Sequence, residues 1–175
     1  RFVALCATDN GTIHISIWNP KKEAAFECVA KLAGHSGPIT SVVWSPCGAF
    51  LVSTSWCTLR IWTWNAKEQK GRQVGCIDSF LFGRIVWSPC GKFVIVKSFY
   101  DSVSIVCWNA KTHTHETVGI IDNPNGHFLD TLASVTCVAW SSCGKIILLA
   151  CNDRVHLIDW DAKTHSLRHL LTLEG

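Results

Sequence analysis

Apolar residues occur along the whole chain in short runs, and polar turn residues separate one run from the next. The stretch from Leu32 to Trp64 shows this most clearly, with turn signals at Pro46-Cys47-Gly48 and at Trp56-Cys57-Thr58. Short runs rich in β-branched and aromatic residues, bounded by Gly, Pro, Asn and Asp, are typical of β-strands. The pattern therefore predicts an all-β chain without a helix.

The predicted strands fall into four groups, of which the first lacks its first strand. Several runs are apolar at every position, as in Ile146-Ile147-Leu148-Leu149, and such strands are expected to be buried on both faces. The fifteen expected ranges are 2–8, 12–19 and 26–32; 39–46, 49–56, 59–65 and 72–80; 84–88, 92–99, 102–109 and 115–122; 134–141, 145–152, 154–161 and 167–173.

Two short motifs recur at corresponding places in these groups. Trp-Ser-[Pro/Ser]-Cys-Gly precedes Trp-[Asn/Asp]-[Pro/Ala]-Lys by 20 or 21 residues in three groups, and the second motif returns every 44 to 52 residues. The first begins at Trp44, Trp87 and Trp140, and the second at Trp18, Trp64, Trp108 and Trp160. A constant spacing on this scale indicates a repeat architecture with one four-stranded unit per repeat.

Together with the Gly34-His35 pair, these motifs resemble the WD40-repeat β-propellers over essentially all of the chain. The resemblance implies a single partial propeller domain of about four four-stranded blades, the first incomplete. The expected blades span about 1–33, 34–82, 83–126 and 127–175. Within the family, the weakly matching repeats are faintly similar to those of a nuclear-pore scaffold protein.

The resemblance also implies structural roles for particular residues. Family members often bury a hydrogen-bonded set made of the His of Gly-His, a hydroxyl on the second strand, an Asp in the next turn and a Trp on the third strand. His35 matches the His, Ser53 or Ser55 the hydroxyl, and Trp62 or Trp64 the Trp, but Trp56-Cys57-Thr58 offers no Asp. We therefore expect an incomplete network. The expected structural repeat residues are Gly34, His35, Trp44, Trp64, Trp87, Trp108, Trp140 and Trp160.

The composition says more about the cellular compartment of the protein than about its function. The 175 residues carry a net charge of +3 and ten cysteines, several of them in apolar strands or in equivalent turns. We therefore expect free thiols in a reducing compartment, the cytoplasm or the nucleus. No apolar run approaches the roughly 18 residues of a membrane helix. The chain begins at Arg1 and contains no Met, so we expect either a piece of a longer propeller chain or a homodimer.

Motifs for catalysis, metals and cofactors are not found in the sequence. There is no Cys-x-x-Cys, no Gly-x-Gly-x-x-Gly and no phosphate-binding Gly-x-x-x-x-Gly-Lys-[Ser/Thr]. His113 and His115 form a pair, which is too few ligands for zinc. The cysteines of the repeated turns, such as Cys47, are explained by repetition. We accordingly predict a protein that is not an enzyme and needs no cofactor or metal.

Two sets of residues are candidates for partner binding. Trp56 and Phe99 lie where second strands end and could anchor a protein partner. Lys67, Lys70, Arg72 and Lys111, with Lys163, follow third strands and could form a basic rim. We predict a non-enzymatic scaffold that binds proteins in a larger assembly, with the nuclear pore as one candidate. A nucleic-acid-associated propeller that binds phosphates through the basic rim is the alternative, disfavoured by the small net charge.

Overall fold

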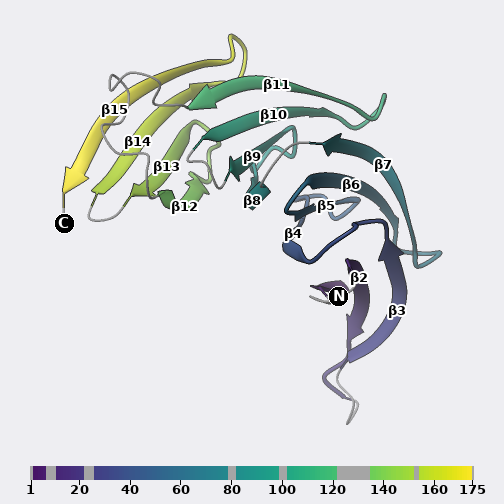
Figure 1. Ribbon diagram of the computed structural model, residues 1–175. Helices are drawn as coiled ribbons and strands as arrows, with labels where there is room; N and C mark the ends of the chain where they lie inside the picture. The colour runs from purple at the N-terminus through teal and green to yellow at the C-terminus, as the bar shows by residue number, and fades with distance from the viewer. Residues whose placement is uncertain are drawn as a thin grey trace. The chain divides into compact units, whose positions relative to one another are not determined.

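The computed structural model describes residues 2–6, 11–21, 26–78, 82–98, 102–121, 135–151 and 154–174. These residues form fifteen β-strands (Figure 1), as the alternation of apolar and polar positions predicts. None of the described residues forms a helix that could cross a membrane. The chain divides into two compact units, Arg1–Gly83 and Arg84–Gly175, and each is described on its own.

The first unit contains two antiparallel sheets whose strand order follows the chain. The sheet at the start has three strands, in agreement with the predicted absence of one strand from the first repeat: β1 (Phe2–Cys6), β2 (Thr12–Trp18) and β3 (Phe26–Ala33). The next sheet has four: β4 (Ile39–Trp44), β5 (Phe50–Ser55), β6 (Thr58–Asn65) and β7 (Lys70–Asp78).

The second unit repeats this arrangement with two four-stranded antiparallel sheets. One contains β8 (Phe82–Trp87), which begins at the end of the first unit, and β9 (Phe93–Ser98), β10 (Val103–Asn109) and β11 (Thr114–Ile121). The other contains β12 (Val135–Trp140), β13 (Ile146–Cys151), β14 (Arg154–Asp161) and β15 (Ser166–Glu174). Short turns join neighbouring strands, so each sheet is a simple meander.

A hydrophobic core lies between the two sheets of each unit. In the first unit, Ile13 and Ile15 of β2 pack with Leu51, Trp62 and Trp64 of the second sheet. In the second unit, the core joins residues of both sheets: Phe93, Ile95, Ile105, Ile147, Leu149, Ile158 and Trp160. Burial of each such side chain contributes about 1.5–3 kcal/mol, which makes sheet-on-sheet packing the main stabilising term.

The repeated Trp-Ser-x-Cys-Gly motif forms the same tight turn three times. Its serine hydroxyl accepts a hydrogen bond from a backbone N–H five residues later, as Ser45 does from Phe50 at 3.0 Å. The glycines Gly48, Gly91 and Gly144 all have φ of 70°, which glycine adopts without steric cost. The sequence repeat is therefore a repeat of backbone geometry.

The prediction that apolar strands are buried on both faces is correct for β5 but wrong for β13. Leu51 to Ser55 are all buried. In β13, Ile147, Leu149 and Cys151 are buried, whereas Ile146, Leu148 and Ala150 are only half-buried. The reason is that one face of the β12–β15 sheet packs in the core and its other face is not covered within the described chain.

Candidate functional site

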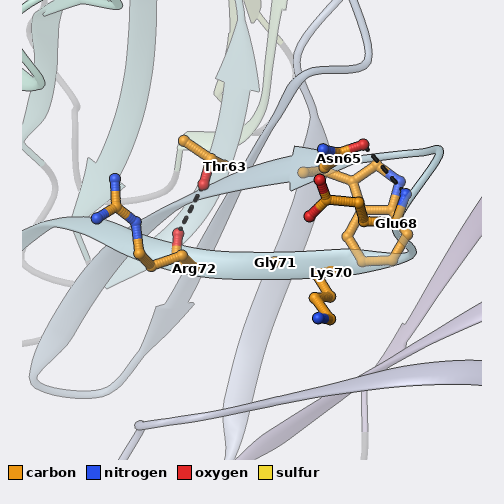
Figure 2. A pocket seen from close by; sticks show the side chains of 7 residues that line it. Thr63, Asn65, Glu68, Lys70, Gly71 and Arg72 are labelled. Carbon is orange, nitrogen blue, oxygen red and sulfur yellow. Dashed lines mark hydrogen bonds between the residues drawn. The ribbon is translucent and has the colours of Figure 1, made fainter.

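A hollow lined by charged side chains lies at the turn between β6 and β7. It has a volume of about 470 Å³. Figure 2 shows its lining, which consists of Thr63, Trp64, Asn65, Glu68, Lys70, Gly71 and Arg72. We call this hollow the β6–β7 cleft. It presents a hydroxyl, an amide, a carboxylate and two cations within ten consecutive residues of the first unit.

Local hydrogen bonds give the cleft its shape. The Asn65 side-chain oxygen accepts bonds from the backbone N–H groups of Lys67, at 3.0 Å, and Glu68, at 3.2 Å. Gln69 closes the turn with a φ of 52°. Across the strands, the Thr63 hydroxyl donates to the Arg72 carbonyl at 3.2 Å. The turn therefore holds Glu68 above the start of β7, where Figure 2 shows its carboxylate over the cleft.

The same turn chemistry explains why Asn replaces Asp in the repeated Trp-[Asn/Asp] motif. Asn109 accepts a backbone hydrogen bond from Lys111 at 3.0 Å, and Asp161 accepts one from Lys163 at 2.8 Å. Both side chains offer the oxygen that this turn needs. These hydrogen bonds hold the pKa of Asp161 below its ordinary value. Asn in place of Asp in this motif therefore leaves the turn unchanged.

A second hollow at the equivalent β10–β11 turn has different chemistry. It measures about 400 Å³, and Cys107, Asn109, Thr114, His115 and Glu116 line it. Burial, together with the charge of Glu116, raises the pKa of the Cys107 thiol, so the thiol stays protonated and weakly nucleophilic. Neither Lys nor Arg lines this hollow. Of the two turns, the one between β6 and β7 is thus better suited to an anionic ligand.

The structure brings together some of the predicted partner-binding residues and separates others. Lys70 and Arg72 both line the β6–β7 cleft. Lys67 is exposed on the same turn but does not line it. Trp56 has 59% of its surface exposed and lies before β6, at the opposite end of that strand from the cleft. Lys111 and Lys163 are exposed on turns of the second unit, and Phe99 lies outside the described residues.

A buried hydrogen-bond network surrounds His35 in the first unit. The two ring nitrogens of His35 lie 2.6 Å from the Ser53 hydroxyl oxygen and 2.7 Å from that of Thr58. The Trp62 indole N–H donates to Ser53 at 2.8 Å, and the Ser55 and Thr58 oxygens are 2.9 Å apart. Thr58 thus takes the place of the missing Asp. The expected incomplete network is in fact complete around His35.

Burial, and then the nearby charge of Arg60, lowers the pKa of His35 to about 4. The ring is therefore neutral near pH 7, and one nitrogen donates while the other accepts. Ser53 beside a histidine resembles the start of a catalytic relay, but Ser53 is fully buried. Because no substrate can reach that hydroxyl, the network is structural.

The other predicted structural residues lie in or beside the sheet cores. Trp44 packs edge-on against Trp64, with ring centroids 6.0 Å apart. Gly34 has tight surroundings, because a Cβ there would lie 3.3 Å from Trp62. The remaining repeat tryptophans are buried or half-buried: Trp87, Trp108, Trp140 and Trp160. In the other repeats, the family's Asp is matched in sequence by Asp9, Asp101 and Asp153, which lie outside the described residues.

Two functional features escaped the sequence analysis. The role of Thr58 was hidden because the family places a carboxylate there, although the Ser55-x-x-Thr58 spacing offers paired hydroxyls. Glu68 was passed over because it is a lone acid among lysines. Within the described ranges, no group of three or more His, Cys, Asp or Glu residues is placed to hold a metal ion.

Comparison with known proteins supports the fold. The family model for the WD domain, G-beta repeat, matches residues 26–63 and 111–159. Among curated proteins, none matches the sequence. Solved structures do match: a candidate 6-phosphogluconolactonase from Bacteroides fragilis has a TM-score of 0.78 and 16% identity over 99% of this chain and 52% of its own.

Two further solved structures are similar. A candidate 6-phosphogluconolactonase from Bacteroides uniformis has a TM-score of 0.81 and 14% identity over 99% of this chain and 52% of its own. The periplasmic gluconolactonase of Pseudomonas aeruginosa has a TM-score of 0.73 and 13% identity over 99% of this chain and 51% of its own. This chain thus spans about half the length of these proteins, and identities this low show a common fold alone.

These findings correct the functional prediction. A non-enzymatic scaffold was expected because the sequence carries no recognisable catalytic or cofactor motif, yet propellers of the same fold are named for lactone hydrolysis. The prediction that the chain is a non-enzymatic scaffold is therefore wrong, and so is its nucleic-acid-binding alternative. Nothing in the comparisons supports the nuclear-pore connection. What the repeats, the sheets and the family model do establish is that the chain belongs to the WD40-repeat family and forms a propeller segment.

Proposed function

We propose that this chain belongs to a lactonase-type propeller and binds an anionic sugar derivative in the β6–β7 cleft. The observation that carries the proposal is the placing of Glu68, Lys70 and Arg72 around one hollow. Cations at such a site attract a carboxylate or phosphate, and the hydroxyl and amide groups suit a polyhydroxylated ligand. The names of the similar solved structures make sugar lactones the first substrate class to test.

The three charged side chains would have different roles. In Figure 2, Lys70 and Arg72 leave β7 in different directions, so they do not converge on one point. One cation can therefore bind the anionic group of the ligand while the other faces the lactone carbonyl. Guanidinium groups bind carboxylate and phosphate through two parallel hydrogen bonds, which favours Arg72 for the anionic group and leaves Lys70 for the carbonyl.

Glu68 would act as the general base. A lactone opens when water adds to its carbonyl carbon and the ring carbon–oxygen bond breaks. Glu68 would take a proton from the attacking water, and that proton would pass to the ring oxygen as it leaves. Atoms balance without a cofactor, because one water is consumed for each ring opened.

The direct test measures binding and turnover together. Titration calorimetry with 6-phosphogluconate and gluconate reports binding, and acid release from 6-phosphogluconolactone and gluconolactone, above the spontaneous rate, reports turnover. We expect Arg72→Gln to weaken binding about tenfold and Glu68→Gln to abolish turnover while binding is kept.

A matched control exists in the other unit. Arg168 occupies on β15 the place that Arg72 has on β7, since Arg168 pairs with Asp159 as Arg72 pairs with Thr63. Arg168→Gln should therefore leave binding unchanged. Equal loss in both arginine variants, or no binding of either sugar acid to the intact protein, would overturn the proposal.

A further inference from the structure

A histidine and a cysteine lie side by side on the three-stranded sheet β1–β3. The sulfur of Cys28 on β3 is 3.9 Å from the Nδ1 atom of His14 on β2, and it is 3.6 Å from the carbonyl oxygen of Ala30. Cys28 is exposed and His14 is half-buried. The thiol proton therefore has two acceptors within reach. Of these, an imidazole nitrogen can take the proton over completely, whereas a carbonyl oxygen cannot.

A β-bulge brings these side chains to the same face of the sheet. His14 pairs with Lys31, and two positions further on Ser16 pairs with Cys28. Cys28 and Lys31 are three positions apart in β3, and residues three apart in a regular strand point to opposite faces. The extra residue of the bulge, Val29, removes this difference. The thiol, the imidazole and the exposed ammonium group of Lys31 therefore share one face.

The other sheets show that this diagonal across the bulge is a place of contact. The pairs β6–β7, β10–β11 and β14–β15 each have a bulge at the same point, just before the repeated tryptophan. On the equivalent diagonal, Arg60 bonds Gln73, and the rings of His156 and His169 have centroids 5.7 Å apart. The contact is therefore a product of the repeat. In the first sheet, it joins a base to a nucleophile.

Serine hydroxyls take the place of the imidazole at three other exposed cysteines. The hydroxyl oxygen lies 3.3, 3.3 and 3.2 Å from the sulfur of Cys47, Cys90 and Cys143, respectively. The hydrogen bond from Ser141 lowers the pKa of the Cys143 thiol, but a hydroxyl cannot take up the thiol proton near pH 7. The base beside Cys28 can, and a thiolate is the nucleophile of disulfide exchange.

We propose that Cys28 and His14 form a thiol-exchange site, at which Cys28 forms a mixed disulfide with a small anionic disulfide of the glutathione type. His14 Nδ1 takes the thiol proton while the Cys28 sulfur bonds to one sulfur of the ligand. The disulfide bond of the ligand breaks, and its second sulfur leaves as a thiolate that receives the proton. One disulfide is consumed and one thiol is released, so the step needs no other oxidant.

Lys31 gives the site its preference for an anion. Its ammonium group lies on the same face as the thiol, where it attracts the carboxylates of a glutathione-type ligand. The site belongs to the sheet β1–β3 and uses no residue of the β6–β7 cleft. Success or failure of the sugar-ligand proposal therefore leaves this inference unaffected.

Site-resolved mass spectrometry after incubation of the 175-residue protein with glutathione disulfide tests the proposal. We expect Cys28 to be modified about tenfold faster than Cys137. Cys137 is the internal control because it is exposed and its thiol also donates to a carbonyl, that of Val138 at 3.9 Å. No histidine is among the described hydrogen-bond partners of Cys137. Equal rates at the two cysteines would overturn the proposal.

Variants of the two neighbours separate their roles. His14→Gln keeps a polar side chain but removes the base, so it should slow the modification of Cys28 about tenfold and leave Cys137 and Cys143 unchanged. His14→Asn is the second variant, in case His14→Gln fails the folding check by circular dichroism. An unchanged rate at Cys28 in a folded His14 variant would overturn the role of the base.

A neutral disulfide tests the role of the cation. Lys31→Gln should slow the reaction of Cys28 with glutathione disulfide about threefold, because the attraction of the ligand's carboxylates is lost. The same variant should react with the uncharged 2-hydroxyethyl disulfide at the rate of the intact protein. Equal slowing with both disulfides would overturn the preference for an anionic ligand.

Discussion

The sheets β4–β7 and β12–β15 are two copies of the same repeat. They differ in how fully their strands are buried and in how their buried histidines are hydrogen-bonded. In β4–β7, the central strand β5 is buried on both faces, and the His35 network gives both ring nitrogens a partner. In β12–β15, β13 is buried on one face only. There His156 bonds Thr172 at 3.0 Å, and its second ring nitrogen is buried with no partner among the described residues. A shared backbone therefore does not imply equally stable sheets.

The two sheets carry different residues at one equivalent position of their third strands. Arg60 of β6 and His156 of β14 occupy equivalent places, two residues before Trp62 and Ile158. Arg60 bonds Gln73 of the neighbouring strand β7, whereas the His156 ring lies beside His169 of β15, with ring centroids 5.7 Å apart. Burial, and then the charges of His169 and Arg154, lowers the pKa of His156. The two sheets therefore differ at their buried histidines, because both ring nitrogens of His35 have a partner and one ring nitrogen of His156 has none among the described residues.

The largest difference between the two sheets is expected when one hydroxyl of the His35 network is removed. Ser53→Ala would leave a His35 nitrogen and the Trp62 N–H buried without partners, so we expect the free energy of unfolding to fall by about 3 kcal/mol. His156→Leu removes an already unpartnered nitrogen and should change it by about 1 kcal/mol or less. Urea denaturation of both variants measures the contrast, and equal losses would contradict it.

Acidification should weaken the sheet that contains the His35 network. Because the His35 pKa in the folded state, about 4, lies below its ordinary value of 6.5, the unfolded chain binds the proton more readily. The stabilisation is fully present above pH 6.5 and is lost as the pH falls through that value toward 4. We expect a loss of about 2 kcal/mol from the free energy of unfolding. In the variant His35→Asn, denaturation at several pH values should show a shallower slope.

The sequence could predict the strands because short runs rich in β-branched and aromatic residues are separated by turn residues at a nearly constant spacing. The fifteen strands follow from runs such as Thr58 to Asn65, and the turns follow from glycines such as Gly48, whose left-handed backbone leaves few other choices. The role of Thr58 could not be predicted in this way. Its hydroxyl reaches His35 across 23 positions of sequence, and only the folded sheet brings the two together.

The β6–β7 cleft was predictable in part. Lys70 and Arg72 stood out as cations, but that they share a hollow with Glu68 depends on how Asn65 folds the turn. Uncovered faces were the hardest to predict. An apolar run such as Ile146 to Ala150 predicts that both faces of the strand are buried, but it does not indicate which element would bury them.

The smallest expected effect concerns the repeated turn. Asn65→Ala removes the acceptor for two backbone N–H groups and should lower the free energy of unfolding by about 1 kcal/mol. Asn65→Asp should be neutral within about 0.5 kcal/mol, because Asp161 already supports the same turn. Thermal denaturation of the pair measures both values. If Asn65→Asp were as damaging as Asn65→Ala, the equivalence of the two side chains would be disproved.

Hydrogen–deuterium exchange of β5 and β13 tests the contrast between the two sheets most directly. Because β5 is buried on both faces and β13 on one face only, we predict that the amides of β13 exchange about tenfold faster than those of β5. Equal protection of the two strands would contradict the account.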